Sequence, residues 1–281
     1  MRILITGSNG FSGRNLIRFL EIETNNILFT SDLVSEGEKK YTQIDLSRFE
    51  QVVGLIETVK PDQIYHLAGS ATNHFEKDYL VNVLSTRNIL QSVLDLKIKT
   101  RILLIGSAAE YGYITQGQNP VKEDYPLNPV SIYGLTKTYQ SSLMKFYVQN
   151  YELDIVMART FNLLGVGLSE NLFIGRLFKQ ISDYKNGKIQ KIILGNLNSK
   201  RDYIEIEEAV KMYYQVMNKG TSGDVYNVGS GQSILIKDLL DKILNENQLD
   251  FSVVEIKEFQ TAGKFDIPEI YSDISKISRL A

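Results

Sequence analysis

Cysteine is absent from this sequence of 281 residues, and histidine is scarce, with only His66 and His74. The lack of cysteine excludes disulfides, thiolate nucleophiles and cysteine-ligated metals. Two histidines are too few for a histidine-based metal cluster, so we expect no metal site. Because His66 lies inside an apolar segment, we interpret it as a hydrogen-bonded core residue rather than a ligand.

A large excess of charge and long apolar runs are also missing. The formal net charge is −2, so no basic field favours nucleic acid or an anionic membrane as a partner. No apolar run approaches the roughly 20 residues that span a bilayer. The N-terminal segment 1–7 has no apolar region followed by a cleavage site. We therefore expect a cytoplasmic protein that binds neither nucleic acid nor membrane.

Short β-rich apolar segments alternate with helical patterns through the first half of the chain. Strands that are apolar on both faces and alternate with helices predict an α/β fold, with a parallel sheet covered by helices. Right-handed crossovers then make the sheet doubly wound. The expected strands are 2–6, 27–31, 63–68, 101–107 and 155–161, and the expected helices are 12–22, 49–59, 79–96 and 133–151.

The second half is less regular and predicts a smaller lobe packed against the sheet. We expect helices at 172–181, 206–218 and 236–244, with short strands at 192–195 and 224–228.

Three glycines, Gly7, Gly10 and Gly13, follow the first strand and open the first helix. Gly7 permits the tight turn, Gly10 allows close approach of a pyrophosphate, and Gly13 lets the helix pack against the strand. The N–H groups and the positive end of the helix dipole then face the phosphates. The loop, including Asn9 and Phe11, is therefore predicted to bind a dinucleotide; the alternative is a turn that merely tolerates glycine.

Asp32 ends the second strand, where a carboxylate accepts hydrogen bonds from ribose hydroxyls. A carboxylate there would repel a 2′-phosphate, so NAD(H) is preferred over NADP(H). Lys39 and Lys40 lie close in sequence and keep NADP(H) open. The alternative for Asp32 is a solvated loop carboxylate.

Tyr133 and Lys137 lie four residues apart at the start of an expected helix, so they share one face. Reduction of a ketone needs a proton for the developing alkoxide. The pKa of tyrosine is about 10, and we expect the neighbouring ammonium to lower it. Ser107 ends the preceding strand and is placed to donate to the same oxygen. An ordinary amphipathic helix is the alternative for the Tyr–Lys pair alone.

These motifs together resemble the extended short-chain dehydrogenase/reductases, and more narrowly their nucleotide-sugar epimerase, dehydratase and reductase branch. The resemblance runs from Ile3 to about Ile277. Its motifs are the glycine loop, Asp45-Leu46, His66-Leu67-Ala68-Gly69, Gly106-Ser107-Ala108-Ala109-Glu110-Tyr111-Gly112, Tyr133-x-x-x-Lys137, Arg159-Thr160-Phe161-Asn162 and Arg201-Asp202-Tyr203-Ile204.

The resemblance implies a Rossmann sheet that binds the cofactor and a small C-terminal substrate lobe. The dinucleotide-binding domain is expected to comprise 1–163 and about 204–229, and the lobe about 164–203 and 230–281. The resemblance also implies the cofactor contacts. Asp45 and Leu46 would border the adenine, Leu67, Ala68 and Gly69 would contact the ribose-phosphate, and Lys137 would hold the nicotinamide ribose.

On the substrate side, the resemblance implies that Ser107 and Tyr133 polarise a sugar carbonyl. Asn162, Asn171 and Leu172 would contact the nucleotide sugar, and Arg201 would contact its diphosphate. Asn162 has an alternative role as a loop cap, Asn171 is equally well an ordinary loop residue, and Arg201 has an alternative as a surface ion pair with Asp202.

The sequence discriminates unequally among the reactions of this branch. The 4,6-dehydratases carry an acid and a base directly after the Ser or Thr, whereas Ala108 and Ala109 stand here, and Glu110 is expected to point elsewhere. We place NAD(P)H-dependent reduction of the 4-keto group of a nucleotide-linked 6-deoxy sugar first. Segment 107–112 looks most like GDP-4-keto-6-deoxy-sugar reductases. An NAD-dependent 4-epimerase is the alternative, because 171–172 and 201–204 look more like epimerases; a cofactor-binding protein without turnover ranks below both.

Two further expectations rest on the resemblance. The family usually places an Arg shortly before the element that is here Asp266-Ile267-Pro268, and this chain has Ala262-Gly263-Lys264 instead. Lys264 would supply only a point charge to a diphosphate. The family also usually forms a homodimer through a four-helix bundle, which would pair the helix near 79–96 with the Tyr/Lys helix.

Overall fold

A seven-stranded parallel sheet forms the centre of the computed structural model, which describes residues 1–34, 41–115, 117–257 and 267–280. Its strand order is β11-β6-β5-β4-β1-β2-β3, so successive strands are added outward in opposite directions on the two sides of the β1–β4 boundary. The doubly wound parallel sheet predicted from the alternating pattern is confirmed. The strands are β1 (Arg2–Thr6), β2 (Ile27–Asp32), β3 (Tyr41–Gln43), β4 (Gln63–His66), β5 (Arg101–Ser107), β6 (Ile155–Thr160) and β11 (Val225–Val228).

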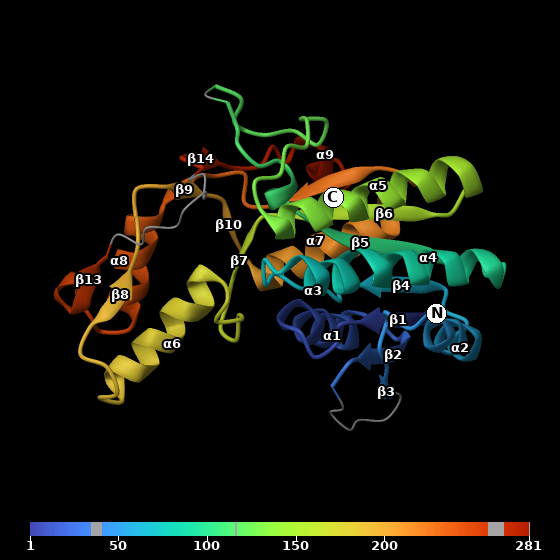
Figure 1. Cartoon of the computed structure of the whole chain (residues 1–281), viewed down its shortest axis with the longest axis horizontal. Coiled ribbons are helices and arrows are strands. Elements are labelled where there is room, and N and C mark those ends of the chain that lie inside the picture. The colour runs from blue at the N-terminus through green and yellow to red at the C-terminus, as the bar shows by residue number, and fades with distance from the viewer. Residues whose placement is uncertain (35–40, 116, 258–266, 281) are drawn as a thin grey trace.

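Helices cover both faces of this sheet (Figure 1). Successive residues of a strand point to opposite faces, so Ile3 and Ile5 pack on one side and Leu4 on the other. The first side is covered by α1 (Phe11–Glu23) and α7 (Ile206–Lys219). The opposite side is covered by α2 (Phe49–Val59), α4 (Ser85–Asp95) and α5 (Ile132–Tyr151).

The remaining elements surround a third apolar cluster, built mainly from α6 (Phe173–Lys185) and α8 (Ile236–Glu246). Figure 1 places these two helices at one end of the sheet, beside β8 and β13. The short strands here are β7 (Asn162–Leu164), β8 (Ile192–Leu194), β9 (Lys200–Arg201), β10 (Tyr203–Glu205), β12 (Ile234–Leu235), β13 (Val254–Ile256) and β14 (Glu269–Ile270). The chain ends with the short helix α9 (Ser275–Ser278).

The prediction of one continuous helix at 79–96 is wrong in detail. The structure has α3 (Phe75–Tyr79), a π-helical turn η1 (Leu80–Leu84) and then α4. A π turn adds a residue to the helical repeat, and such turns are often found at functional sites. Short 3₁₀ turns occur at η2 (Ala108–Glu110) and η3 (Phe251–Val253).

No helix within the described ranges is long and apolar enough to cross a membrane.

Candidate active site

A cavity of about 760 Å³ opens where the carboxyl ends of β1, β4, β5 and β6 meet α6 and the short strands around it. Ligands of doubly wound sheets bind at this edge, where the strand order reverses. The cavity brings together residues that are far apart in the sequence and that we singled out from it. These are Gly7, Gly10, Phe11, Gly13, Leu67, Gly69, Ser107, Tyr133, Lys137, Asn162, Asn171, Leu172 and Arg201.

The glycine loop is built so that no side chain fits at two of its positions. Gly7 has φ 70°, and a Cβ there would lie 2.5 Å from the backbone nitrogen of Ala68. A Cβ on Gly13 would lie 2.3 Å from the carbonyl oxygen of Gly7. Gly10 precedes α1 and supplies no side-chain cap, so the first-turn N–H groups remain available to an anion at the cavity wall. The loop therefore fits a dinucleotide pyrophosphate.

Asn9 and Asp32 support the loop rather than line the cavity. The Asn9 N–H donates to Asp32 Oδ2 at 2.9 Å, and the Leu33 N–H donates to Asp32 Oδ1 at 2.7 Å. The Asn9 side chain donates to the carbonyl oxygen of Val34. Asp32 thus fixes the glycine loop to the end of β2, and its expected contact with a ribose stays a prediction. Lys39 and Lys40 lie outside the described residues.

Asp45, Leu46 and Ala68 also do not line the cavity. The Asp45 carboxylate accepts hydrogen bonds from the N–H and the hydroxyl of Ser47, at 2.9 and 2.7 Å. The carbonyl oxygen of Leu46 accepts from Asn88. Their expected positions around the adenine are therefore not reached by this cavity and remain predictions.

Ser107, Tyr133 and Lys137 converge from two elements. Ser107 is the last residue of β5, and Tyr133 lies in the first turn of α5, whose N-terminus is capped by the Ser131 hydroxyl accepting from the Gly134 N–H at 3.0 Å. Lys137 lies one turn later, and its Nζ donates to the Ile105 carbonyl oxygen at 2.9 Å. All three residues thus line the same cavity, and the side chains of Tyr133 and Ser107 are hydrogen-bonded.

The expectation that the pKa of Tyr133 lies below its ordinary value is wrong in this structure. Burial raises the pKa of Tyr133 to about 12, hydrogen bonding to Ser107 acts against this rise, and Glu110 and Asp78 add to it. Burial lowers the pKa of Lys137 to about 8, against the attraction of the same two carboxylates. The cost of placing a phenolate in an enclosed site outweighs local attraction. Tyr133 is therefore a protonated acid at neutral pH.

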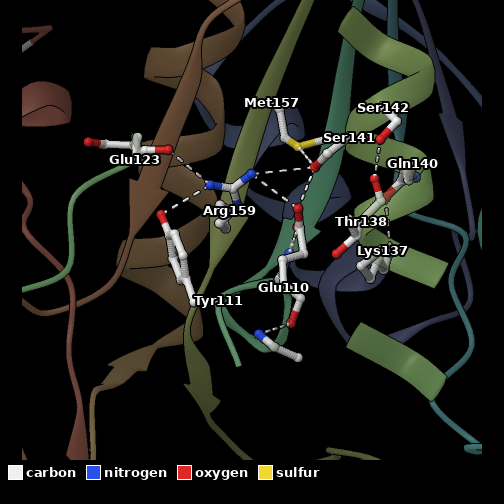
Figure 2. A network of polar contacts seen from close by, with 12 residues as sticks. Glu110, Tyr111, Glu123, Lys137, Thr138, Gln140, Ser141, Ser142, Met157 and Arg159 are labelled. Carbon is white, nitrogen blue, oxygen red and sulfur yellow. Dashed lines mark hydrogen bonds and ion pairs between the residues drawn. The ribbon is translucent and has the colours of Figure 1, made fainter. Parts of the chain in front are cut away.

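A buried polar network behind Ser107 was not predicted from the sequence (Figure 2). Glu110 and Arg159 form a buried ion pair, with 3.1 Å between Oε2 and Nη2. Glu110 Oε1 accepts the Ser107 N–H at 2.7 Å, and the Ser141 hydroxyl donates to Oε2. The expectation that Glu110 points away from the reacting groups is confirmed. The one available signal was Arg159 itself, because a charge inside an apolar strand requires a partner.

The residues expected to contact the substrate line the cavity and also make hydrogen bonds within the protein. Asn162 Nδ2 donates to the Asp202 carbonyl oxygen at 2.9 Å, which fits its alternative role as a loop cap, and Asn162 also lines the cavity. Arg201 lines the cavity and donates to the Ile267 carbonyl oxygen at 2.6 Å. The Asp202 carboxylate is buried and accepts from Ser230 and Ser272.

Asn171 and Leu172 precede α6 and line the cavity as well. Of the segment that replaces the expected arginine, Ala262, Gly263, Lys264 and Asp266 lie outside the described residues.

Residues 3–229 match the model of the NAD dependent epimerase/dehydratase family. The chain belongs to this family. A GDP-6-deoxy-D-talose 4-dehydrogenase of Aggregatibacter actinomycetemcomitans is 29% identical, over 99% of this chain and 90% of that protein. A GDP-6-deoxy-D-mannose reductase of Pseudomonas aeruginosa is 25% identical, over 90% of this chain and 83% of that protein. The family resemblance and the expectation of an NAD(P)-dependent enzyme are thereby confirmed.

A solved structure of RMD from Pseudomonas aeruginosa, complexed with NADPH, has a TM-score of 0.84 to this chain. The two are 23% identical, and the match covers 100% of this chain and 93% of that one. The similarity extends over the sheet and over the elements around α6 and α8. It supports the Rossmann-type fold.

Proposed function

We propose that this protein uses NADH or NADPH to reduce the 4-keto group of a nucleotide-linked 6-deoxy sugar. The observation that carries the proposal is that Ser107, Tyr133 and Lys137 line the same cavity as the glycine loop. Two relatives whose names describe oxidation or reduction of GDP-linked 6-deoxy sugars support a GDP-sugar as substrate.

The proposed chemistry divides into a hydride and a proton. The reduced nicotinamide supplies the hydride to the keto carbon when it is bound. Tyr133 donates its phenolic proton to the oxygen, and the Ser107 hydroxyl donates a hydrogen bond to the same oxygen. Lys137 stabilises the phenolate that Tyr133 leaves behind, because a nearby ammonium favours the charged form. General acid catalysis of this kind contributes roughly 100- to 10,000-fold in rate.

The names of two relatives favour reduction over 4-epimerisation, since both describe oxidoreductases of GDP-linked 6-deoxy sugars. Tyr133 is protonated at neutral pH, as the proton donor of a reduction must be. NAD-dependent 4-epimerisation remains the alternative, because the family contains epimerases.

Dehydration is disfavoured by the residues that follow Ser107. Ala108 and Ala109 line the cavity and have no proton to transfer. Glu110 is the nearest carboxyl in sequence, and its oxygens accept from Ser107, Ser141 and Arg159. A 4,6-dehydratase needs both an acid and a base at this place.

The proposed cofactor site runs from the glycine loop to Lys137. Gly7, Asn9, Gly10, Phe11 and Gly13 would form the pyrophosphate site. The adenosine would lie towards Asp32, Asp45 and Leu46, with Leu67, Ala68 and Gly69 along the ribose-phosphate. The carboxylate of Asp32 would repel a 2′-phosphate, so NAD(H) is the preferred cofactor.

The substrate would lie between the sheet edge and the smaller lobe. We assign residues 1–163 and about 204–229 to the dinucleotide-binding domain, and about 164–203 and 230–281 to the lobe. The separate apolar cluster around α6 and α8 supports this division. Asn162, Asn171, Leu172 and Arg201 would contact the nucleotide sugar, with Arg201 meeting its diphosphate.

A homodimer is proposed through α5 and the helical stretch of α3, η1 and α4. Large apolar side chains are exposed on both, at 38 to 49% of their surface. They are Phe75, Tyr79, Leu80, Tyr139, Phe146 and Tyr151. Light scattering of the purified protein tests this assembly, and Phe146→Glu should yield monomers.

We keep a cytoplasmic location as part of the proposal, which fractionation of the producing cells tests.

Turnover assays test the function directly. The purified protein is offered GDP-, dTDP- and UDP-linked 4-keto-6-deoxyhexoses with NADH or NADPH, and absorbance of the reduced cofactor is followed. Reduction predicts loss of one reduced cofactor per sugar, fastest with the GDP-linked sugar. Conversion of a 4-hydroxy sugar into its C4 epimer, with no net change in cofactor, would support the epimerase instead. Binding of cofactor without turnover of any sugar would leave the non-catalytic alternative.

A further inference from the structure

Gln140 is a fully buried amide on α5, one turn beyond Lys137. Its Oε1 accepts a hydrogen bond from Lys137 Nζ at 3.1 Å, and its Nε2 donates to the Thr86 hydroxyl at 2.8 Å. Figure 2 shows Lys137 and Gln140 together on this helix. Burial of an amide costs free energy unless both of its ends find partners, and here both do.

The direction of the Gln140 amide is fixed by Thr86. The Thr86 hydroxyl has one proton, and it donates that proton to the Asn82 carbonyl oxygen at 2.8 Å. Towards Gln140 the Thr86 oxygen can only accept. A reversed amide would place two oxygens together at Thr86 and would point the NH₂ group at the Lys137 ammonium. The network therefore assigns the amide oxygen to Lys137.

The hydrogen bonds continue beyond Thr86 to the end of β1, with the Thr86 oxygen accepting from both sides. His66 Nε2 lies 3.1 Å from the Thr86 hydroxyl oxygen, and because that hydroxyl donates elsewhere, Nε2 carries the proton. His66 Nδ1 then accepts from the Thr6 hydroxyl at 2.7 Å. Burial, together with the charge of Lys137, lowers the pKa of His66 to about 3, so the ring is neutral. A chain of directed hydrogen bonds thus joins Lys137 to Thr6, the residue before Gly7.

We infer that Gln140 is a positioning residue for Lys137, and that Thr86 acts through it by fixing which amide atom faces the ammonium. Two of the three ammonium protons are directed to Ile105 and Gln140. The nitrogen thereby stays at the cavity wall, where a Cβ on Gly69 would lie 3.6 Å from it. The role of this position in catalysis rests on the proposed function. The hydrogen bonds from Lys137 to Gln140 and from Gln140 to Thr86 do not depend on it.

Charged groups from several elements act on the same ammonium. Glu110 from η2 and Asp78 from α3 favour its charged form, and burial disfavours it. His66 from β4 is neutral, and the Tyr133 phenol is protonated at the same pH. Loss of the Gln140 acceptor removes a favourable contact of the charged form, so Lys137 should release its proton at lower pH.

Proton binding by Lys137 can be measured in the whole protein without cofactor or substrate. The protein is labelled with ¹³C at lysine Cε, and the Lys137 signal is assigned by its loss in Lys137→Met. NMR spectra recorded over a range of pH then give the titration midpoint, the pH at which Lys137 is half protonated. We expect Gln140→Leu to weaken proton binding by about tenfold, which is one pH unit. Gln140→Glu should strengthen proton binding by a similar factor, because it adds an opposite charge.

Variants of Thr86 separate positioning from packing. Thr86→Val should lower the Lys137 midpoint in the same direction as Gln140→Leu, whereas Thr86→Ser, which keeps the hydroxyl, should restore it. Ser142→Ala is the matched control, since Ser142 lies on the same helix with its hydroxyl bonded at the surface. A loosened fold would raise the midpoint towards that of a free lysine, the opposite sign. The inference would be overturned if the proton affinity of Lys137, taken from its titration midpoint, stayed within roughly twofold of wild type in both Gln140→Leu and Thr86→Val.

The pH profile of sugar reduction supplies the second readout. Rate should fall as pH rises through the Lys137 pKa, and Gln140→Leu should move that fall to lower pH while Gln140→Glu moves it higher. Shifted NMR midpoints in a protein with no turnover would support the positioning role and contradict the proposed function. Full turnover with unshifted midpoints and unshifted pH profiles would support the proposed function and contradict the positioning role.

Discussion

The Arg159 guanidinium and the Glu110 carboxylate form an ion pair of 3.1 Å, with side chains 2% and 0% exposed. Through Oε1, Glu110 also accepts the backbone N–H of Ser107, and through Oε2 it accepts the hydroxyl of Ser141 on α5. One carboxylate therefore joins the end of β5, the neighbouring strand β6 and the helix that carries Tyr133 and Lys137. The relative placement of the three proposed catalytic groups depends on it.

Glu110→Gln should destabilise the fold strongly, because it leaves the buried Arg159 guanidinium without its carboxylate counter-charge. We expect the free energy of unfolding to fall by about 3 to 5 kcal/mol, measured by urea denaturation. The matched control is Glu246→Gln, which removes an exposed pair with Lys242 and should leave stability nearly unchanged. Equal behaviour of the two variants would contradict this account of the buried pair.

Tyr133→Phe should abolish the proton donor and leave the cavity otherwise intact. We expect kcat for sugar reduction to fall by about 100- to 10,000-fold. Cofactor affinity, measured by fluorescence titration of the reduced cofactor, should change little. Tyr139→Phe, on the same helix but outside the cavity, is the control; it keeps the ring at the proposed dimer contact and should keep its rate. Retained turnover in Tyr133→Phe would exclude this phenol as the acid.

His66 should make the protein sensitive to mild acid. Its pKa is lowered to about 3 by burial, so the unfolded chain binds the extra proton first as pH falls below about 6.5. Stability should then drop by about 1.4 kcal/mol per pH unit from His66 alone. Urea unfolding between pH 7 and 4 should show a shallower decline in His66→Gln than in wild type.

Gly13→Ala should damage the cofactor loop, because its Cβ would meet the Gly7 carbonyl oxygen at 2.3 Å. We expect affinity for NADH to fall by at least about tenfold, measured by calorimetry. Gly54→Ala is the opposite case, since nothing lies within 4 Å of the added atom on the exposed side of α2. That change should stabilise the protein by about 0.5 to 1 kcal/mol, as expected in a helix. Equal NADH affinity in wild type and Gly13→Ala would argue against the pyrophosphate site.

The sheet could be predicted because its strands are long enough to carry a pattern. Residues 2–6 and 101–107 were expected as strands and 49–59 as a helix, and β1, β5 and α2 have these bounds. Strands of two residues, such as β9 and β12, show no alternation of their own and were missed. Their existence depends on pairing with distant segments, which local sequence does not encode.

The residues that line the cavity could be predicted where residue type agrees with position at the end of a strand or the start of a helix, as at Gly7, Ser107 and Lys137. The predicted direction of the Tyr133 pKa shift was wrong, because the shift depends on the burial of the phenol, which is a property of the whole fold. Glu110 and Gln140 were not assigned roles, since each depends on a partner far along the chain, Ser141 at 31 residues and Thr86 at 54. A buried polar side chain becomes informative only once its partner is known.

Hydride transfer from labelled cofactor tests the central claim most directly. Reduced cofactor carrying deuterium at C4 of the nicotinamide is reacted with a GDP-linked 4-keto-6-deoxyhexose, and the product is analysed by NMR and mass spectrometry. The account predicts one deuterium at C4 of the sugar, a single configuration there, and one oxidised cofactor per product. A sugar product without deuterium, or formation of both C4 epimers while the cofactor stays reduced, would contradict it.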